Sequence, residues 1–359
     1  MKVAIVHDDL VQFGGAERVL EGICEIYPDA PIYTSVYDPS NEQLRKRFRS
    51  KKIITSSLQK IPGWKYLYKP LFFLYPIAFE QFDFTGFDLV ISHTTRFAKS
   101  VITKPETKHI CYCHTPPRFL WNFSGENQYV WLKPLMEYLR RYDRVSANRV
   151  DLFLAGSENA KVRIKEIYGM DSKVVYPFID LTRFAGIETF DGGYFVVISR
   201  LNRYKRVDLA VEACLRLEIP LKVIGSGFEE KILKQVQDDV GSNRIEFLGD
   251  LSDEMVVKVL AGARALIIPG IEDFGLASLE AQALGKPVIA YREGGALESV
   301  IDNKTGIFFS EPTVNSLASS IIRFNDLNHF DKDKCIKNVK RFSKETFIKS
   351  FKQTVASLC

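Results

Sequence analysis

The sequence predicts an α/β protein with two doubly wound domains, each built on a parallel sheet. Short runs rich in valine and isoleucine alternate with longer segments of helical period along the chain. The runs are continuously apolar, which is typical of parallel strands covered by helices on both faces. A chain of 359 residues is long enough for about two such domains.

The second half shows this alternation most clearly. Strands are expected at 194–198, 221–224, 244–248, 265–268, 287–290 and 306–309. Helices are expected at 207–218, 228–240, 252–262, 276–284, 296–301 and 313–325. Gly285-Lys286-Pro287 ends one helix and begins the next strand, because glycine stops a helix and proline cannot continue it.

The first half repeats the pattern less regularly. Strands are expected at 3–6, 32–36, 89–92, 109–113, 152–155 and 173–176, and helices at 16–26, 133–150 and 159–168. Residues 43–80 do not fit a βαβ unit and are predicted to be an insertion. Asp191-Gly192-Gly193 precedes the second series, so we expect domains at 1–182 and 183–340. Residues 341–359 close a basic amphipathic segment.

Composition excludes several classes of protein. The longest strongly apolar run, Leu71–Phe79, contains Pro76 and is far shorter than the ~20 residues of a transmembrane helix. The first ten residues lack the apolar core of a secretory signal. The six cysteines are scattered without a C-x-x-C pair. They are therefore expected to be reduced, mostly buried thiols of a cytoplasmic protein.

The net charge of +5 is concentrated in one segment. Residues 1–180 hold 25 cations and 20 acids, whereas the remainder is balanced. Residues 43–79 contain nine cations, no acid and several interleaved aromatic side chains.

Open parallel sheets bind ligands at the carboxyl ends of their strands, so the loops after strands are the candidate sites. The loop after 194–198 contains Arg200 and Lys205, which can clamp a diphosphate. The loop after 221–224 contains Gly225-Ser226-Gly227, half of a dinucleotide fingerprint. The third glycine and a suitably placed acid are missing, so a dehydrogenase is disfavoured.

The segment Pro269–Glu280 joins a strand to a helix and places Glu272 in the loop and Glu280 in the helix. Eight helical steps would separate these acids by ~12 Å. That distance exceeds the roughly 5–9.5 Å between paired glycosidase carboxylates, so a two-carboxylate hydrolase is disfavoured. We expect the two carboxylates to bind different parts of one extended ligand. The amides of Phe274, Gly275 and Leu276, beside Asp273, would point at it from the helix N-terminus.

Polar residues follow strands of the first half as well. His7-Asp8-Asp9 come directly after the first strand, where a polar substrate can reach them. Gly14-Gly15 precede a helix and permit close approach of an anionic ligand. His114 follows the strand at 109–113 and begins a stretch that includes Arg118 and Trp121.

Together these segments resemble the retaining glycosyltransferases of family 4, the GT-B class. The matching pieces, in family order, are Gly14–Arg18, Tyr176–Asp180, Ser199–Leu201 with Lys205-Arg206, Gly225–Gly227, Phe247–Gly249 and Glu272–Glu280. His7–Glu17 and His114–Trp121 resemble the branch that includes O-antigen mannosyltransferases. The resemblance implies two Rossmann-like domains facing a central cleft. The N-terminal domain would bind the acceptor and the C-terminal domain the nucleotide sugar, and the final helix would cross back to the N-terminal domain.

The resemblance also implies residue roles. Arg200 and Lys205 would bind the diphosphate, Glu272 and the following amides the donor sugar, and Glu280 the ribose. His114 would lie by the donor sugar, with Gly14 and Gly15 near the β-phosphate. Further donor contacts are expected from Gly225, Asp273 and Leu248, and acceptor contacts from Asp9, Arg118 and Trp121. Three departures limit the transfer: Ser199 and Arg206 replace glycines of the family, and Ala155-Gly156-Ser157 stands where an asparagine is common.

The expected chemistry is metal-independent and uses no cofactor beyond the nucleotide-sugar co-substrate. Arg200, Lys205 and helix N-termini would stabilise the departing phosphate. No D-x-D motif and no defensible nucleophile is present. Retention would then follow from same-face attack, with the leaving phosphate deprotonating the acceptor hydroxyl.

The expected function is transfer of mannose from GDP-mannose to a growing bacterial surface polysaccharide such as a lipopolysaccharide O-antigen, carried on polyprenyl diphosphate. Alternatives are a UDP-sugar-dependent transferase, a nucleotide-sugar 2-epimerase and a sugar-nucleotide-binding scaffold without turnover. An acceptor-free assay separates the epimerase, which needs only the nucleotide sugar.

The basic aromatic segment suggests where the enzyme works. Nucleic acid is discounted because no RNA-binding motif accompanies the cations. Residues 45–75 are expected to dock on anionic lipid, since each cation near such a surface contributes ~1 kcal/mol. The enzyme would then be cytoplasmic and peripheral at the inner face of the cytoplasmic membrane. The alternative is a solvated basic face over a buried aromatic cluster.

Overall fold

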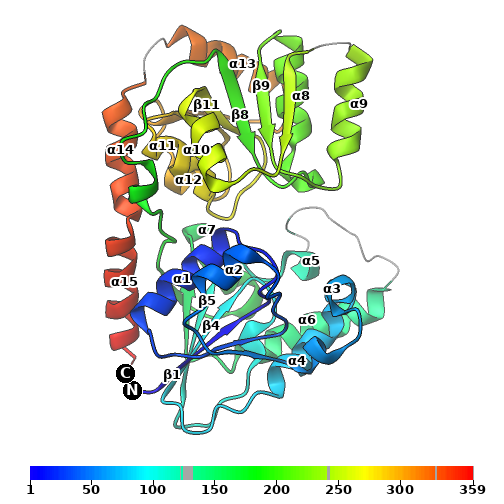
Figure 1. Ribbon diagram of the computed structural model, residues 1–359, viewed down its shortest axis with the longest axis vertical. Helices are drawn as coiled ribbons and strands as arrows, with labels where there is room; N and C mark the ends of the chain where they lie inside the picture. The colour runs from blue at the N-terminus through cyan, green and yellow to red at the C-terminus, as the bar shows by residue number, and fades with distance from the viewer. Residues whose placement is uncertain (122, 124–131, 241–242, 328–329, 359) are drawn as a thin grey trace. The chain divides into compact units, whose positions relative to one another are not determined.

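The computed structural model describes residues 1–121, 123, 132–240, 243–327 and 330–358 (Figure 1). The chain divides into two compact units. The N-terminal unit comprises Met1–Pro177 together with Lys344–Cys359, and the C-terminal unit comprises Phe178–Ser343. The boundary expected after residue 182 falls just beyond the division at Pro177.

The N-terminal unit contains a seven-stranded, all-parallel sheet of order β3-β2-β1-β4-β5-β6-β7. Its strands are β1 (Val3–His7), β2 (Ile32–Thr34), β3 (Ile53–Thr55), β4 (Leu89–Thr94), β5 (Lys108–Cys113), β6 (Leu152–Ala155) and β7 (Ser172–Val174). The strand order reverses between β1 and β4. Ligands of open α/β sheets bind at such a switch point.

The helices of this unit follow the strands in sequence. They are α1 (Gly15–Ile26), α2 (Glu42–Arg47), α3 (Trp64–Leu67), α4 (Tyr75–Glu80), α5 (Arg118–Trp121), α6 (Lys133–Ala147), α7 (Glu158–Tyr168) and α15 (Lys344–Ala356). Sequence signals set their ends. Ser157 caps α7 by accepting a hydrogen bond from Ala160 N at 2.9 Å, and Gly169 ends that helix in the left-handed conformation.

The prediction that residues 43–80 stand outside the sheet was wrong for their first part. Helix α2 connects β2 to β3, and β3 pairs in parallel with β2 at the sheet edge. The strand is only three residues long, so its periodicity was too short to detect. The true insertion lies between β3 and β4, where Phe72 and Tyr75 are buried in the core of the unit.

The last helix, α15, packs on the N-terminal unit. The Phe347 ring meets Tyr112 of β5 at 6.2 Å, and Lys344 pairs with Glu25 of α1 at 2.5 Å. The two ends of the chain consequently lie side by side (Figure 1).

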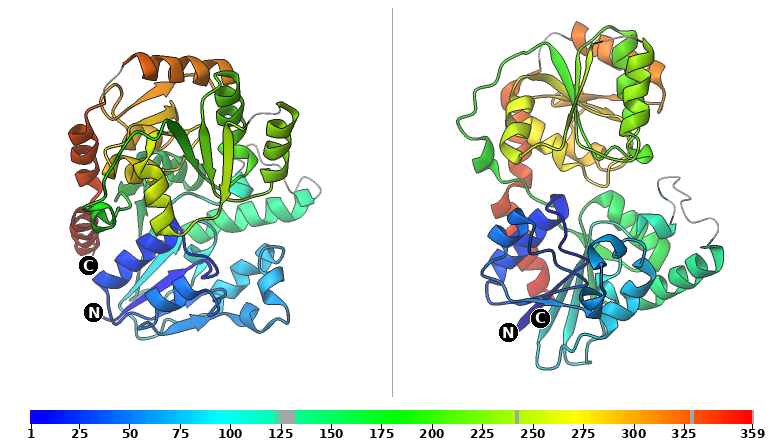
Figure 2. Two further views of the ribbon diagram at one scale, coloured as in Figure 1. Left: turned by 45° about the horizontal axis from the view of Figure 1, so that its top comes forward. Right: turned by 45° about the vertical axis from the view of Figure 1, so that its right-hand side comes forward.

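The C-terminal unit holds a six-stranded parallel sheet of order β10-β9-β8-β11-β12-β13. Its strands are β8 (Tyr194–Ile198), β9 (Leu221–Ile224), β10 (Ile245–Gly249), β11 (Ala263–Ile268), β12 (Val288–Tyr291) and β13 (Gly306–Phe309). Its helices are α8 (Val207–Arg216), α9 (Glu230–Val240), α10 (Asp253–Ala261), α11 (Leu276–Ala283), α12 (Ala296–Ser299), α13 (Val314–Asp326) and α14 (Lys332–Val339). Helices cover both faces of this sheet (Figure 2).

The prediction of two doubly wound α/β domains is confirmed. The six strands and six helices expected in the second half all occur, with ends shifted by at most two residues. The five described cysteines are buried free thiols, as expected. Among the described residues, no helix is both long and apolar enough to span a bilayer.

Candidate active site

The residues expected to bind the donor in the C-terminal domain gather at the carboxyl edge of its sheet. Lys205 ends a short turn after β8, and Glu272 lies in the loop after β11. The Lys205 Nζ and Glu272 Oε1 atoms are 2.5 Å apart. The two loops touch closely, since a Cβ on Gly270 would lie 2.7 Å from the Lys205 carbonyl carbon. The structure therefore brings together two residues that the sequence places 67 positions apart.

The Glu272 loop is held in place by the loop after β12. Gly295 N donates to the Glu272 carbonyl at 2.8 Å. A side chain on Gly295 would collide with the backbone of Phe274, so only glycine permits this approach. Phe274 is buried, with its ring 5.3 Å from that of Phe342. The position of Glu272 is thus fixed by backbone packing.

Helix α11 begins at Leu276 directly after this loop. Gly275 is its N-cap in the left-handed conformation, and no side chain caps the helix. The first amides of α11 are therefore available to an anion or hydroxyl. Asp273 lies in the same loop and is partly exposed.

Glu280 lies one turn into α11 and forms a separate ion pair. Its Oε1 is 3.3 Å from Arg183 Nη1, and Arg183 also approaches Asp253 at 3.6 Å. Glu272 and Glu280 thus pair with different cations, which agrees with the expectation that they contact different parts of one extended ligand. Arg183 could not be predicted from the sequence, because it is 97 residues from Glu280 and belongs to no strand-end loop.

Arg200 is exposed in the loop after β8. This loop rests on Gly225-Ser226-Gly227, since Leu201 N donates to Ser226 O at 2.9 Å. A Cβ on Gly225 would collide with the Ser199 carbonyl. These glycines therefore let the loop after β9 pack closely against the loop that carries the cations. Leu248 lies near the end of β10, half-buried at the same edge.

Arg206, which replaces a family glycine, adopts the conformation that glycine favours. Its φ and ψ are 51° and 38°, in the left-handed region. The guanidinium is held by Asp208, with Nη2 3.0 Å from Oδ2. Although Arg206 replaces the glycine, the backbone at this position keeps the conformation that a glycine would adopt.

In the N-terminal domain, the residues after β1 are buried rather than open to substrate. Asp8 accepts hydrogen bonds from the backbone amides of Thr95, Arg96, Phe97 and Ala98 at 2.6–2.9 Å. Asp9 is 3% exposed and forms an ion pair with Arg96. Burial raises the pKa of Asp9, although the charge of Arg96 opposes this. Arg96 is the more accessible partner of this pair, because its side chain is 31% exposed.

Gly14 and Gly15 form the N-terminus of α1, and Glu17 holds them. Glu17 Oε2 accepts from Gly14 N at 2.7 Å, and Oε1 faces His7 Nε2 at 3.4 Å. Burial alone would raise the pKa of Glu17, but the hydrogen bond and charge of His7 lower it below its ordinary value.

His114 follows β5 at the same edge of the sheet and is half-buried. Its Nε2 is 2.8 Å from Nε2 of His93, at the end of β4. His93 could not be predicted from the sequence, because a histidine inside a buried strand gives no functional signal.

Trp121 and Arg118 lie in α5. The Trp121 indole donates to Asp143 Oδ2 at 2.8 Å, and Asp143 also forms a buried ion pair with Lys99. Arg118 is half-buried. Trp121 thus fastens α5 to α6 through its only polar atom.

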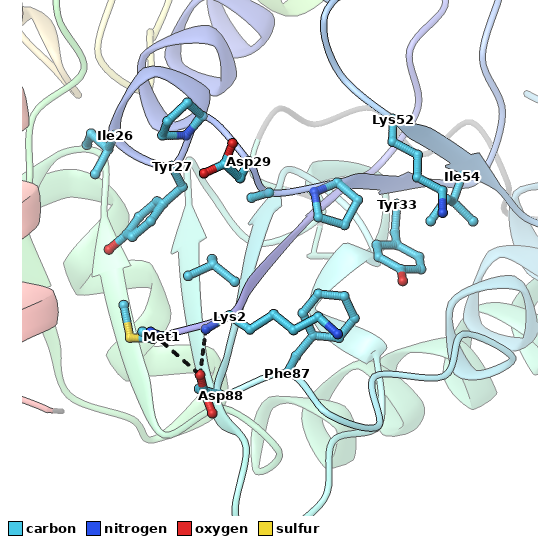
Figure 3. Close-up of a pocket in the computed structure, with 14 residues that line it drawn as sticks. Met1, Lys2, Ile26, Tyr27, Asp29, Tyr33, Lys52, Ile54, Phe87 and Asp88 are labelled. Carbon is cyan, nitrogen blue, oxygen red and sulfur yellow. Dashed lines mark hydrogen bonds and ion pairs between the residues drawn. The ribbon is translucent and has the colours of Figure 1, made fainter.

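A cavity of about 690 Å³ lies at the opposite, amino edge of the N-terminal sheet (Figure 3). Lys2, Tyr27, Tyr33 and Phe87 are among its lining residues. None of the expected site residues contributes to it. A second hollow of about 510 Å³, lined by Gly227, Phe228 and residues of α9, adjoins the loop after β9.

The chain matches known families over both domains. Residues 13–183 match the family described as Glycosyltransferase Family 4, and residues 183–347 match Glycosyl transferases group 1. The human alpha-1,3/1,6-mannosyltransferase ALG2 is 26% identical, over 90% of this chain and 86% of the human protein. An uncharacterized glycosyltransferase of Methanocaldococcus jannaschii is also 26% identical, over 96% and 94%.

Solved structures share the fold. Sucrose-phosphate synthase from Thermosynechococcus elongatus gives a TM-score of 0.78 at 16% identity, covering 100% of this chain and 99% of the synthase. Anabaena HepE in complex with UDP-glucose gives 0.74 at 19% identity, covering 99% and 100%. The chain belongs to the glycosyltransferases of family 4, has the GT-B fold and is a hexosyltransferase.

Proposed function

We propose that the protein is a retaining, metal-independent mannosyltransferase that uses GDP-mannose and a lipid-linked saccharide acceptor. The observation that carries this proposal is the Lys205–Glu272 pair, held by two strand-end loops beside Arg200. A cation and an acid at this spacing suit a sugar diphosphate, because the cation can bind the phosphates and the carboxylate can accept hydrogen bonds from the sugar. Mannose is favoured because human ALG2, similar over nine-tenths of this chain, is described as a mannosyltransferase.

Donor binding would exchange the partners of this pair. The Lys205 ammonium would turn to the diphosphate, and Glu272 would accept hydrogen bonds from sugar hydroxyls. Arg200 would add a bidentate contact to the phosphates. Glu280, oriented by Arg183 at 3.3 Å, would accept from the ribose hydroxyls. The cost of separating Lys205 from Glu272 is small, because the ammonium gains the anionic phosphates and the carboxylate gains hydroxyl donors.

The chemical step develops negative charge on the leaving phosphate and positive charge on the anomeric carbon. Lys205, Arg200 and the amides of α11 would stabilise the former. The acceptor hydroxyl would attack the anomeric carbon from the face that the phosphate leaves and give its proton to that phosphate. Attack on the same face retains the anomeric configuration. His114 is assigned to the donor sugar, and Gly14 with Gly15 to the β-phosphate.

The acceptor is proposed to be a polyprenyl-diphosphate-linked saccharide of a bacterial surface polysaccharide, as in the O-antigen branch. Segment 45–75 supports a membrane location at the cytoplasmic leaflet. Tyr66 is 86% exposed, and the nearby Leu67 and Phe73 are also exposed. Lys60 and Lys69 are exposed among them, whereas Lys51 is occupied by carbonyls at the end of α1.

Flotation with vesicles tests the location. We expect the protein to float with vesicles containing phosphatidylglycerol and to lose binding at high salt. A variant with Tyr66→Ser and Phe73→Ser should bind more weakly, whereas Ile102→Ser, an exposed apolar residue outside the segment, should not. Equal, salt-insensitive binding to neutral and anionic vesicles would contradict the proposal.

A donor panel tests the reaction. GDP-mannose should raise the melting temperature and support transfer to a lipid-linked acceptor, with no turnover when the acceptor is omitted. A UDP-sugar transferase is the second candidate, because HepE binds UDP-glucose in a structure of the same fold. Stabilisation and transfer with UDP-glucose but not GDP-mannose would establish that candidate instead. Acceptor-free turnover would indicate an epimerase.

A further inference from the structure

Arg183 joins two acidic side chains on neighbouring helices of the C-terminal domain. Its Nη1 is 3.3 Å from Glu280 Oε1 on α11, and its Nη2 is 3.6 Å from Asp253 Oδ2 at the start of α10. Helix α10 packs against α11. The Arg183 and Glu280 side chains are 18% and 16% exposed, so their pair is largely withdrawn from bulk water. The attraction between them is therefore screened less than that of an exposed pair.

The turn that carries Arg183 is fixed at both ends. Residues 181–184 form a short turn of 3-10 helix, and Asp180 caps it by accepting from Thr182 N at 3.0 Å. Phe184 ends the turn as a buried side chain, and the Arg183 guanidinium lies 5.3 Å from the centre of its ring. The turn therefore presents the guanidinium to α11 from a fixed base.

A buried polar network anchors the opposite face of α11. Ser278 Oγ is 2.7 Å from Ser299 Oγ, and Gln282 Nε2 donates to the Ser299 carbonyl at 2.9 Å. Asn338 Nδ2, on α14, donates to Gln282 Oε1 at 2.7 Å. A helix turns by about 100° per residue, so Ser278 and Gln282 share one face and Glu280 projects from the other. The network holds the helix from its buried side, and the orientation of the Glu280 side chain is set separately.

Glu280 has one carboxylate oxygen engaged and one open. Its ion pair with Arg183 uses Oε1. Within the part of the chain that the structure describes, no residue donates a hydrogen bond to Oε2. This second oxygen can therefore accept from a ligand hydroxyl. Fixing the rotatable bonds of a glutamate before the ligand arrives removes an entropy cost of binding.

Arg183 itself is poorly suited to bind a phosphate. Its guanidinium is already shared by two carboxylates, so a further anion would compete with both of them. Arg200 and Lys205, on the loop after β8, remain the cations assigned to the diphosphate. A neutral hydroxyl suits this cluster better, because it can donate to Glu280 without displacing the guanidinium.

We propose that Arg183 is a positioning residue that holds Glu280 in the orientation that accepts a hydrogen bond from a ribose hydroxyl of the donor. Arg183 thereby makes the site selective for ribonucleotides over nucleotides that lack these hydroxyls. The assignment of Glu280 to the ribose rests on the proposed function. It does not depend on the base or the sugar of the donor, because GDP-mannose and UDP-sugars all contain the ribose.

Nucleotide binding tests the role of Arg183 without an activity assay. The probes are GDP, UDP and their 2′,3′-dideoxy counterparts, which lack both ribose hydroxyls, with Kd measured by titration calorimetry. For the ribonucleotide that binds more tightly, the wild-type Kd should be at least about tenfold below that of its dideoxy form, as expected for a hydrogen bond to a charged group. In Arg183→Gln this ratio should fall to about twofold. Arg183→Lys keeps a cation beside Glu280 and should retain most of the ratio.

Arg264→Gln is the matched control. Arg264 is likewise paired with an acid, Asp191 at 3.5 Å, and lies 5.5 Å from the ring centre of Phe195 in the same domain. Its replacement should leave the ratio unchanged. Glu280→Gln should itself lower the ratio, and adding Arg183→Gln should lower it no further, because both changes remove the same contact.

A purely structural Arg183 would give a different pattern. Arg183→Gln would then weaken the ribonucleotide and its dideoxy form equally, and such an unchanged ratio would overturn the proposal. A further fall of the ratio in the double variant would also overturn it, because Arg183 would then act independently of Glu280. If Arg183→Gln does not fold, Arg183→Met takes its place, since it keeps an apolar stem over Phe184 and removes the charge.

The proposed function and the role of Arg183 fail in distinguishable ways. Selectivity that depends on Arg183 with UDP but not with GDP would contradict the GDP-mannose assignment and support the positioning role. The same selectivity in a protein that transfers no sugar would contradict the transferase and still support that role. A wild-type protein that binds ribo- and dideoxynucleotides equally would contradict both the ribose assignment of Glu280 and the proposal.

Kinetics supply a second readout. Arg183→Gln should raise the KM for the donor about tenfold and leave kcat nearly unchanged, because a ribose contact is equally strong in the ground and transition states. Arg183→Lys should restore most of the wild-type KM. A wild-type KM in Arg183→Gln would overturn the positioning role.

Discussion

The carboxyl edges of the two sheets both carry polar side chains, which are accessible to solvent in the C-terminal domain and buried in the N-terminal domain. In the C-terminal domain, Lys205, Glu272, Arg183 and Glu280 pair through long side chains that are 11–20% exposed. In the N-terminal domain, His7, Asp8, Asp9 and Glu17 are at most 5% exposed and are held by backbone amides, by Arg96 or by one another. Accessible pairs can exchange partners with a ligand, whereas buried carboxylates cannot without leaving donors unsatisfied. Substitutions should therefore affect transfer at the first edge and stability at the second.

The largest expected effect is at Asp8, on the buried edge. Asp8→Ala leaves four backbone amides without an acceptor, so the free energy of unfolding should fall by on the order of 4 kcal/mol. Urea unfolding followed by tryptophan fluorescence measures this, because all three tryptophans fall within residues 1–177. Asp83→Ala, which removes an exposed carboxylate that bonds Thr85, should cause no measurable change. Wild-type stability of Asp8→Ala would show that this edge is not structural.

The next effect is at the accessible pair. Lys205→Ala or Glu272→Ala should lower kcat/KM by about 10²-fold, about 2.7 kcal/mol, with the melting temperature unchanged. The charge swap Lys205→Glu with Glu272→Lys should keep the fold without restoring transfer. Lys222→Ala is the control, since Lys222 pairs with Glu246 at 3.2 Å in the same sheet. Near-wild-type turnover of either single variant would remove that residue from the site.

A smaller effect is expected at Glu280. Glu280→Gln keeps the shape of the side chain but removes the charge that Arg183 orients. The KM for the donor should rise about tenfold, about 1.4 kcal/mol, with kcat nearly unchanged, because ribose contacts are equal in ground and transition states. A large loss of kcat at unchanged KM would place Glu280 in the chemical step and contradict its assignment to the ribose.

Site residues in local sequence patterns could be predicted from the sequence, whereas those positioned by long-range contacts could not. Lys205 and Glu272 were found because each lies in a local strand-to-helix pattern that needs no long-range information. Arg183 and His93 were missed because their partners are 97 and 86 residues away, so only the folded sheet brings them together. Exposure was similarly unreadable. Asp9 was expected to face the acceptor, but parallel pairing of β1 with β4 places Arg96 over it.

Edge strand β3 shows the same limit for the fold. Its three residues pair only with β2, and the surrounding charges of residues 45–52 resemble a loop. The longer strands of the C-terminal domain gave clear apolar runs, because both of their faces are buried.

The smallest expected effect tests whether the accessible edge depends on backbone strain at Arg206. A left-handed non-glycine residue costs ~1–2 kcal/mol, and the exposed pair with Asp208 recovers ~0.5 kcal/mol. Arg206→Gly relieves the strain but loses the pair and adds freedom to the unfolded chain, so stability should change by less than about 1 kcal/mol. Arg206→Ala loses the pair and keeps the strain. It should therefore be less stable than Arg206→Gly by about 1 kcal/mol in thermal unfolding followed by circular dichroism. An alanine variant as stable as the glycine variant would show that the loop relaxes freely, in which case the position of Lys205 is set by its contact with Glu272 rather than by the turn.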